Sequence, residues 1–275
     1  MKRQASHRLR PMLYRCGALA SLTLATTVAW TTASHAQTKP HPACADRVLK
    51  VAIDIGHSPA TVGAVSARGR SEYSFNRRFA LELVARAKTQ PDRPRTLRSA
   101  RRPLKLDLFA IRPNAQRLGL KARTAIAARR QADLFLSIHH DSVQPRYLKT
   151  WTYQGKKRPY SEAFRGFSMF VYRGNPDFAG SLKLARLIAE RFKGRGFTQT
   201  LHHAEPIKGE NRKLLSWQYG IYDVNFAVLR TARTASVLLE LGVIINPDDE
   251  AMVDRPETRR AHAQAILDAL RAFCP

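Results

Sequence analysis

Four side chains that could bind a metal or move a proton lie beside short, largely apolar runs of this 275-residue chain: His57, Glu72, His139 and Glu240. The runs 51–56 and 134–138 each end directly before a histidine, and the run 236–241 contains Glu240. Such runs are typical of strands buried on both faces of a sheet. Because ligands of open α/β sheets bind beside the carboxyl ends of the strands, we expect the four side chains to meet at one edge.

These residue types match the ligands and the base of a hydrolytic zinc site. A catalytic zinc keeps three imidazole or carboxylate ligands and one open position, and His57, Glu72 and His139 supply such a set. Glu240 is then the carboxylate best placed to act as general base toward water. The compact His-Glu-x-x-His pattern is absent, however, and a lone histidine at a strand end is more often an ordinary hydrogen-bonded residue. From the residues alone, both interpretations stay open.

The segments around these runs predict an α/β fold. Apolar residues recur at helical spacing over 73–88, 120–132, 178–192, 225–233 and 257–273. Further strand candidates are 95–99 and 166–172, and the polar stretch that ends at 222 predicts a loop region. Strands alternating with helices favour a single domain with a mainly parallel, twisted sheet of about six strands and helices on both faces.

The first 36 residues have the pattern of a secretory signal peptide. They contain five basic and no acidic residues, an apolar stretch over 18–33, and a Ser34-His35-Ala36 triplet that predicts cleavage after Ala36. A retained membrane anchor is the alternative, but the stretch is shorter than the about 20 apolar residues of a spanning helix. We therefore expect a signal peptide over 1–36, a short leader over 37–46, a catalytic domain over 47–275, a periplasmic or secreted protein, and no stable membrane insertion.

The chain is strongly cationic, with a formal net charge of +26. This charge favours anionic partners, which include nucleic acid, acidic lipid headgroups and cell-wall polymers with free carboxylates. Export favours the wall, and a merely solvated basic surface is the alternative. Nucleic acid is supported by charge alone, so we do not expect it as a partner.

Two cysteines remain after the expected cleavage, Cys44 before the first strand and Cys274 beside the end of the chain. In an oxidising compartment such a pair predicts a disulfide that joins the ends of the domain. The ends of a domain often lie close together, which makes the bond plausible. A free pair is the alternative.

The segments that carry the candidate residues resemble those of the zinc-dependent N-acetylmuramoyl-L-alanine amidases, the amidase type 3 family of cell-wall hydrolases. The matching segments are 53–57, 69–72, 123–139, 226–230 and 237–246, and the likeness runs in order over 48–273. It implies that His57, Glu72 and His139 bind zinc and that Glu240 is catalytic. It also implies cleavage of the amide bond between N-acetylmuramic acid and the L-alanine of the peptidoglycan stem peptide.

Some residues depart from the family pattern or lie outside it. His140 follows the third expected ligand and could touch the site or pack beside it, and together with Arg123 it is a candidate for substrate binding. Residues 100–119 predict a long cationic loop over the site, either contacting substrate or exposed. His202 and His203 lie in the polar stretch, where a solvated loop is favoured over a role at the cleft.

A peptidoglycan-binding protein that keeps the fold and does not hydrolyse is the alternative function. The intact Glu240 argues against it, because a binding protein has no chemical need for that carboxylate. Peptidoglycan is the expected partner in either case. A protein activator is a further possible partner, which the sequence does not identify.

Overall fold

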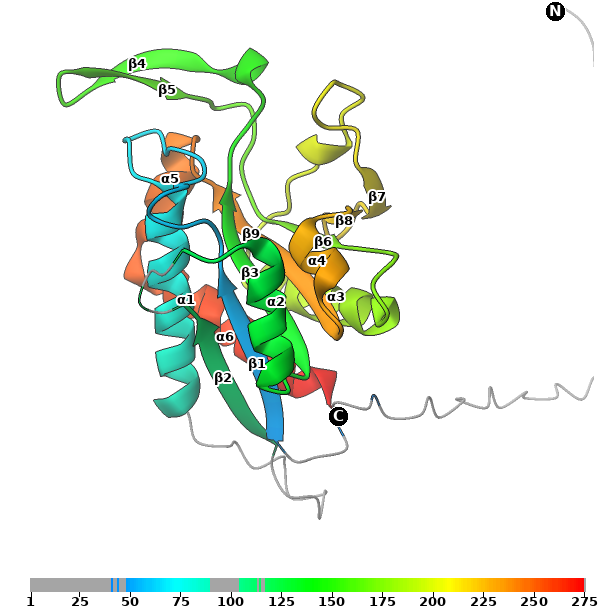
Figure 1. Ribbon diagram of the computed structural model, residues 1–275. Helices are drawn as coiled ribbons and strands as arrows, with labels where there is room; N and C mark the ends of the chain where they lie inside the picture. Colours follow the sequence, from blue (N-terminus) through cyan, green and yellow to red (C-terminus); the bar gives the residue numbers. More distant parts are fainter. Residues whose placement is uncertain are drawn as a thin grey trace, which may run out of the picture. The chain divides into compact units, whose positions relative to one another are not determined.

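A computed structural model describes residues 41, 44, 48–89, 104–112, 114 and 117–274 of the chain (Figure 1). The expected signal peptide, most of the expected leader and the strand expected at 95–99 lie outside these residues. Among the described residues, no helix combines the length and the apolar character that crossing a membrane requires.

Seven strands form the central sheet, in the order β2-β1-β3-β9-β6-β8-β7. Their bounds are β1 Val48–Ile55, β2 Lys105–Ile111, β3 Leu134–Asp141, β6 Ser168–Val171, β7 Lys213–Ser216, β8 Ile221–Asp223 and β9 Ala235–Val243. The pairs β2-β1, β1-β3, β3-β9 and β6-β8 are parallel, whereas β9-β6 and β8-β7 are antiparallel. The predicted α/β class with a mainly parallel sheet is confirmed, with seven strands and two antiparallel pairs.

Helices cover both faces of the sheet, as the sequence predicted. On one face lie α1 (Glu72–Thr89), α3 (Phe178–Lys193) and α6 (Pro256–Phe273), and on the other lie α2 (Leu120–Arg129) and α4 (Ala227–Thr231). In β1 the residues at 49, 51, 53 and 55 pack toward α1 and its neighbours, while Ala52 packs toward the α2 side. Alternate residues of a strand point to opposite faces, so a continuously apolar strand buries both faces.

The end of β9 leads into a further helix, α5 (Pro247–Asp254). The Asn246 side chain accepts hydrogen bonds from the backbone N–H groups of Asp248 and Asp249, and Pro247 stands at the first position of the helix. These are the usual features of a helix start. The acidic stretch after β9 therefore begins a helix.

The region predicted as a loop over 100–119 contains the strand β2. The prediction was wrong for 105–111, where exposed Lys105 and Asp107 alternate with more buried Leu106 and Leu108 along the edge of the sheet. Charged side chains are common on edge strands. Those of β2 interrupt the apolar run by which a strand is recognised in the sequence. The polar stretch before 222 likewise contains the short strands β7 and β8.

A separate hairpin stands outside the central sheet. It consists of β4 (Lys149–Tyr153) and β5 (Lys156–Tyr160), joined by a two-residue turn whose Gln154 and Gly155 both have positive φ angles. The indole N–H of Trp151 donates to the carbonyl of Ala67 at 3.0 Å, which fastens the hairpin to the loop before α1. Figure 1 shows the hairpin extending over the end of the molecule where α5 lies.

The two ends of the described domain are joined by a disulfide between Cys44 and Cys274. The two residues are 230 positions apart in the sequence, and their Cα atoms are 5.2 Å apart. Cys274 directly follows α6 and is buried against the same core as the first strand.

Candidate metal centre and catalytic pocket

His57 lies two residues beyond the end of β1 in an unusual backbone conformation. Its φ angle is 63°, in the left-handed region that residues other than glycine seldom occupy. Its carbonyl accepts hydrogen bonds from Arg112 at 2.7 Å and from Arg123 at 3.2 Å. Both guanidinium groups also donate to the carbonyl of Ile55. Two arginines therefore hold the chain where it turns the imidazole out of the sheet, and such strain is common at functional sites.

A buried ion pair between β1 and α2 stabilises this turn. Asp54 in β1 is fully buried, and its carboxylate lies 3.3 Å from Nη1 of Arg123 in α2. The hydroxyl of Ser137 in β3 donates to the same carboxylate at 2.8 Å. Arg123 was a candidate for substrate binding, but the structure commits its guanidinium to Asp54 and to two backbone carbonyls. We assign it a positioning role.

Glu72 is the first residue of α1 and is almost fully buried. Its Oε2 accepts from the backbone N–H of Ala64 at 3.0 Å, and its Oε1 accepts from the side chain of Asn76 at 3.0 Å and from the backbone N–H of His140 at 3.3 Å. Hydrogen bonds of this kind orient a metal-ligating carboxylate. The start of the helix thus presents Glu72 in one fixed direction.

The structure brings the three expected metal ligands together. Nε2 of His57 lies 3.0 Å from Oε2 of Glu72, and Nδ1 of His139 lies 2.9 Å from its Oε1. One ligand atom from each residue lies within 4.8 Å of the others. Burial acts to raise the pKa of Glu72, but hydrogen bonds with His139 and His57 lower it well below its usual range. Two imidazoles and an ionised carboxylate form a donor set that zinc accepts.

Two glycines leave the space that this cluster occupies. A Cβ atom at Gly56 would lie 2.5 Å from the ring of His139, and one at Gly63 would lie 2.4 Å from Oε2 of Glu72. Gly63 also has a φ of 77°, which favours glycine. Any larger residue at either position would push a ligand side chain out of place.

Glu240 stands beside the cluster on the neighbouring strand. Its Cα is paired in register with that of His139 across β3 and β9. Among the described residues, no group hydrogen-bonds the buried Oε2 atom of Glu240. Burial, and then the charges of Asp141 and Glu72, raise its pKa well above the usual range. A raised pKa favours the protonated carboxyl, as a group that accepts a proton and passes it on requires.

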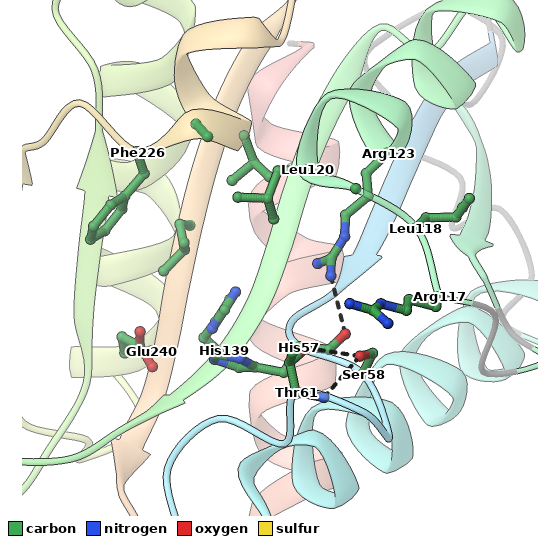
Figure 2. Close-up of a pocket in the computed structure, with 14 residues that line it drawn as sticks. His57, Ser58, Thr61, Arg117, Leu118, Leu120, Arg123, His139, Phe226 and Glu240 are labelled. Atoms are coloured by element: carbon green, nitrogen blue, oxygen red, sulfur yellow. Dashed lines mark hydrogen bonds between the residues drawn. The ribbon is translucent and has the colours of Figure 1, made fainter.

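Two residues of the cluster and Glu240 line one pocket of about 580 Å³. His57, His139 and Glu240 lie on one side, and Figure 2 shows Arg117 and Arg123 on another. The remaining wall is mostly apolar and comes from β9, from α2 and α4, and from residues just before these helices: Leu118, Leu120, Phe226, Val228 and Leu238. The segment after β2, residues 117–119, does line this pocket, so part of the stretch predicted as a loop lies at the site.

His140 points away from the metal ligands and into the core. Its Nδ1 lies 2.7 Å from Oδ1 of Asn76, and its ring packs at 5.4 Å from that of Phe75. Burial lowers its pKa to about 3, so the ring is neutral. Of the two roles left open for His140, the structure favours packing beside the site over contact with substrate.

The prediction of a solvated loop at His202 and His203 was wrong. Both side chains are buried, in the short 3-10 turn η3 (His202–Ala204). Nε2 of His203 lies 2.8 Å from Oδ2 of Asp141, at the end of β3, and Nε2 of His202 lies 3.4 Å from the same atom. A polar segment can bury histidines when a carboxylate hydrogen-bonds to them. Asp141 is the residue in the sequence that could have indicated this burial.

Burial acts to lower the pKa of His203, but the charge of Asp141 and hydrogen bonds to Asp141 and Glu210 raise it to about 9. Burial lowers the pKa of the neighbouring His202. The two adjacent histidines therefore have opposite pKa shifts, because only His203 has a carboxylate on both ring nitrogens.

The family model for N-acetylmuramoyl-L-alanine amidases matches residues 51–272. Among curated proteins, a probable cell wall amidase, LytH, of Staphylococcus aureus is 29% identical over 143 residues, covering 52% of this chain and 36% of that protein. The LytH protein of Staphylococcus saprophyticus is 44% identical over 62 residues, covering 22% of this chain and 21% of that protein. The chain thus matches only about a fifth to a third of the length of these relatives.

Solved structures of similar fold cover most of the chain. The catalytic domain of CwlV, an N-acetylmuramoyl-L-alanine amidase from Bacillus (Paenibacillus) polymyxa, is 25% identical with a TM-score of 0.58, covering 82% of this chain and 97% of that one. The N-acetylmuramyl-L-alanine amidase Ami1 of Mycobacterium smegmatis is 21% identical with a TM-score of 0.59, covering 82% and 96%. The second likeness is one of fold.

Proposed function

The chain belongs to the N-acetylmuramoyl-L-alanine amidase family, and from that premise we propose that it is an exported zinc hydrolase acting on peptidoglycan. The bond cleaved is the amide between N-acetylmuramic acid and the L-alanine of the stem peptide. One observation carries the proposal: His57, Glu72 and His139 converge beside Glu240 at the rim of a single pocket.

His57, Glu72 and His139 are the residues that would hold the metal. When bound, zinc supplies Lewis-acid polarisation of the scissile carbonyl. The chain itself supplies the rigidity, since Arg112 and Arg123 hold the carbonyl of His57, and Asn76 holds the carboxylate of Glu72. Ligands held in this way need little rearrangement when the substrate arrives.

Glu240 is the proposed general base and acid. Glu240 lines the pocket, and its buried Oε2 has no hydrogen-bond partner among the described residues, so the carboxylate keeps an acceptor for a water molecule beside the substrate. Oε2 takes a proton from the attacking water and passes it to the leaving nitrogen of L-alanine. Both transfers use the same carboxylate, and no covalent intermediate with the protein is required.

The walls of the pocket suit a peptide attached to a sugar. Apolar side chains of α2 and α4 offer contact to the lactyl and alanyl methyl groups, and Arg117 offers a cation to a stem-peptide carboxylate. The formal net charge of +26 also favours a wall polymer with free carboxylates. Residues 1–36 as a signal peptide would deliver the protein to the periplasm or the exterior.

The test is release of soluble peptide from purified peptidoglycan by the mature protein. We expect peptides with a free L-alanine amino terminus, loss of release on chelation, and recovery when zinc is restored. Zinc-loaded protein that binds peptidoglycan and releases nothing would support the alternative of a binding protein.

Glu240→Gln tests the base separately from the metal. We expect kcat to fall by about 10²–10⁴-fold, the usual contribution of general acid–base catalysis, with an unchanged zinc content. Glu162→Gln is the matched control, because Glu162 is an exposed carboxylate that pairs only with Lys149 at the surface. Ordinary turnover by Glu240→Gln would remove Glu240 from the mechanism.

A further inference from the structure

We propose that Asp141, His202 and His203 form a second site for a divalent cation of the zinc class, separate from the site of His57, Glu72 and His139. The three side chains each offer a ligand atom within 4.8 Å of the others. The inference concerns metal binding alone and does not depend on the hydrolytic activity.

The ligand atoms point to a common place. Nε2 of His203 and Nε2 of His202 lie 2.8 Å and 3.4 Å from the same oxygen, Oδ2 of Asp141. Two imidazole nitrogens that converge on one carboxylate oxygen are arranged as a metal-binding set of two histidines and a carboxylate. The rings of His202 and His203 lie with their centroids 4.0 Å apart, so neither nitrogen can turn away without moving the other ring.

The opposite nitrogen of each ring already has a partner. Nδ1 of His203 lies 2.8 Å from Oε2 of Glu210, and Nδ1 of His202 lies 2.8 Å from the hydroxyl of Thr200. Gln144 in turn donates to Glu210 at 2.7 Å. A metal-ligating histidine almost always gives its second N–H to a carboxylate or another acceptor, which fixes the tautomer that leaves the first nitrogen free. Both histidines have that support.

A metal-free network accounts for only part of this geometry. A His203 that donates from both ring nitrogens would satisfy Asp141 and Glu210 together, since each carboxylate oxygen lies 2.8 Å from one of them. It would satisfy His202 less well, because Nε2 of His202 lies 3.4 Å from Oδ2 of Asp141 and makes no well-aligned hydrogen bond with the described residues. A buried nitrogen without a well-aligned partner destabilises the fold, because it has given up its hydrogen bonds to water. A cation bound to both histidines and Asp141 would use that nitrogen.

The proposed site connects the end of β3 with the turn η3. Asp141 ends β3, whereas His202 and His203 belong to the turn η3, which the ring of Phe164 covers by stacking on His202 at 4.8 Å. The backbone N–H of Arg212 donates to the carbonyl of His203 at 2.7 Å. A cation here would tie the turn to the strand that also carries His139.

The experiment counts metal per chain after dialysis of the full mature protein against zinc. We expect two equivalents for the wild type, one for His57→Ala/His139→Ala, one for Asp141→Asn/His203→Gln, and none when all four are changed. The matched control is His262→Gln, since His262 is also buried and its ring packs against Phe192 and Phe197, and this variant should keep two equivalents. One equivalent in the wild type, lost in His57→Ala/His139→Ala, would overturn the proposal.

A second measurement covers variants that do not fold. His57→Ala/His139→Ala keeps the proposed second site intact, so added zinc should raise its melting temperature by binding the native state. Added Co²⁺ should produce the visible absorption of a cobalt site in the same variant. If the variant is folded by circular dichroism and shows neither effect, Asp141, His202 and His203 form only a hydrogen-bonded network, and the proposal is wrong.

Discussion

The two histidine clusters at the end of β3 differ most in their access to solvent. The side chain of His57 is 33% exposed and lines the pocket beside Glu240, whereas the side chains of His202 and His203 are 1% and 7% exposed. Metal sites that perform catalysis keep an open position for water or substrate, and structural sites are closed. Both clusters combine two histidines with a carboxylate, and both include a residue of β3. They suit different roles because only the cluster of His57, Glu72 and His139 lies at a pocket.

The clusters also differ in how many parts of the chain build them. The first takes one residue each from the end of β1, the start of α1 and the end of β3. The second takes both histidines from one turn and only Asp141 from β3. A change in the first should alter chemistry, and a change in the second should alter how the turn is held.

Turnover gives the largest expected contrast between the clusters. His139→Ala removes a proposed ligand of the open site and should lower kcat by at least about 10³-fold, the equivalent of several kcal/mol of transition-state stabilisation. His203→Gln should lower kcat by less than about 10-fold, below the loss of about 10–100-fold that follows removal of a group bonded to a metal ligand, because His203 is not among the residues that line the pocket. The rate of peptide release from peptidoglycan measures both variants. Equal losses of kcat would contradict the different roles given to the two clusters.

Removal of the Arg123–Asp54 ion pair beside His57 should have the next largest effect, and this effect is on stability. Arg123→Met leaves Asp54 buried without its cation, and breaking such a pair costs about 3–5 kcal/mol. Arg117→Met, in the same pocket but exposed, should change the free energy of unfolding by no more than about 0.5 kcal/mol. Urea denaturation of both variants tests this, and a similar small change in both would contradict the role given to the pair.

The closed cluster should have the smaller effect, and one that depends on pH. In metal-free protein the pKa of His203 is raised from 6.5 to about 9, because Asp141 and Glu210 outweigh burial. The folded state therefore binds the proton more tightly, so the stabilisation is fully present below pH 6.5 and is lost as pH rises through about 9. We expect a loss of about 3 kcal/mol, because one pKa unit corresponds to about 1.4 kcal/mol.

Urea denaturation at pH 6 and pH 9.5 in the presence of chelator measures this loss. His203→Gln should show a flatter dependence on pH than the wild type over the same range. An equal decline in both proteins would assign the titration to other groups and would remove His203 as the source of the difference.

The strands that the sequence predicted well are those buried on both faces. β1, β3 and β9 are nearly continuous apolar runs, and the side chains expected at their ends meet as predicted. The edge strand β2 was missed because Lys105 and Asp107 face solvent, and β7 and β8 were missed because each has only three or four residues. Short and edge strands depend on their neighbours for burial, which a local pattern does not reveal.

The same reasoning explains the contacts near the site that were not predicted. The ion pair of Arg123 with Asp54 joins residues that lie 69 positions apart in the chain. His202 and His203 looked solvated because their carboxylate, Asp141, lies on another strand. Motif spacing identified which residues converge on the pocket, but which charges neutralise each other is a property of the folded chain.

The bond between Cys44 and Cys274 turns nearly the whole domain into a covalent ring. A single cut of the backbone anywhere between these residues would open the ring without releasing a fragment, because the two pieces would still be joined through sulfur. In the oxidising compartment that we propose for this protein, a domain closed in this way can be nicked once and keep its strands in register. Its loss would then require either a second cut or a reductant.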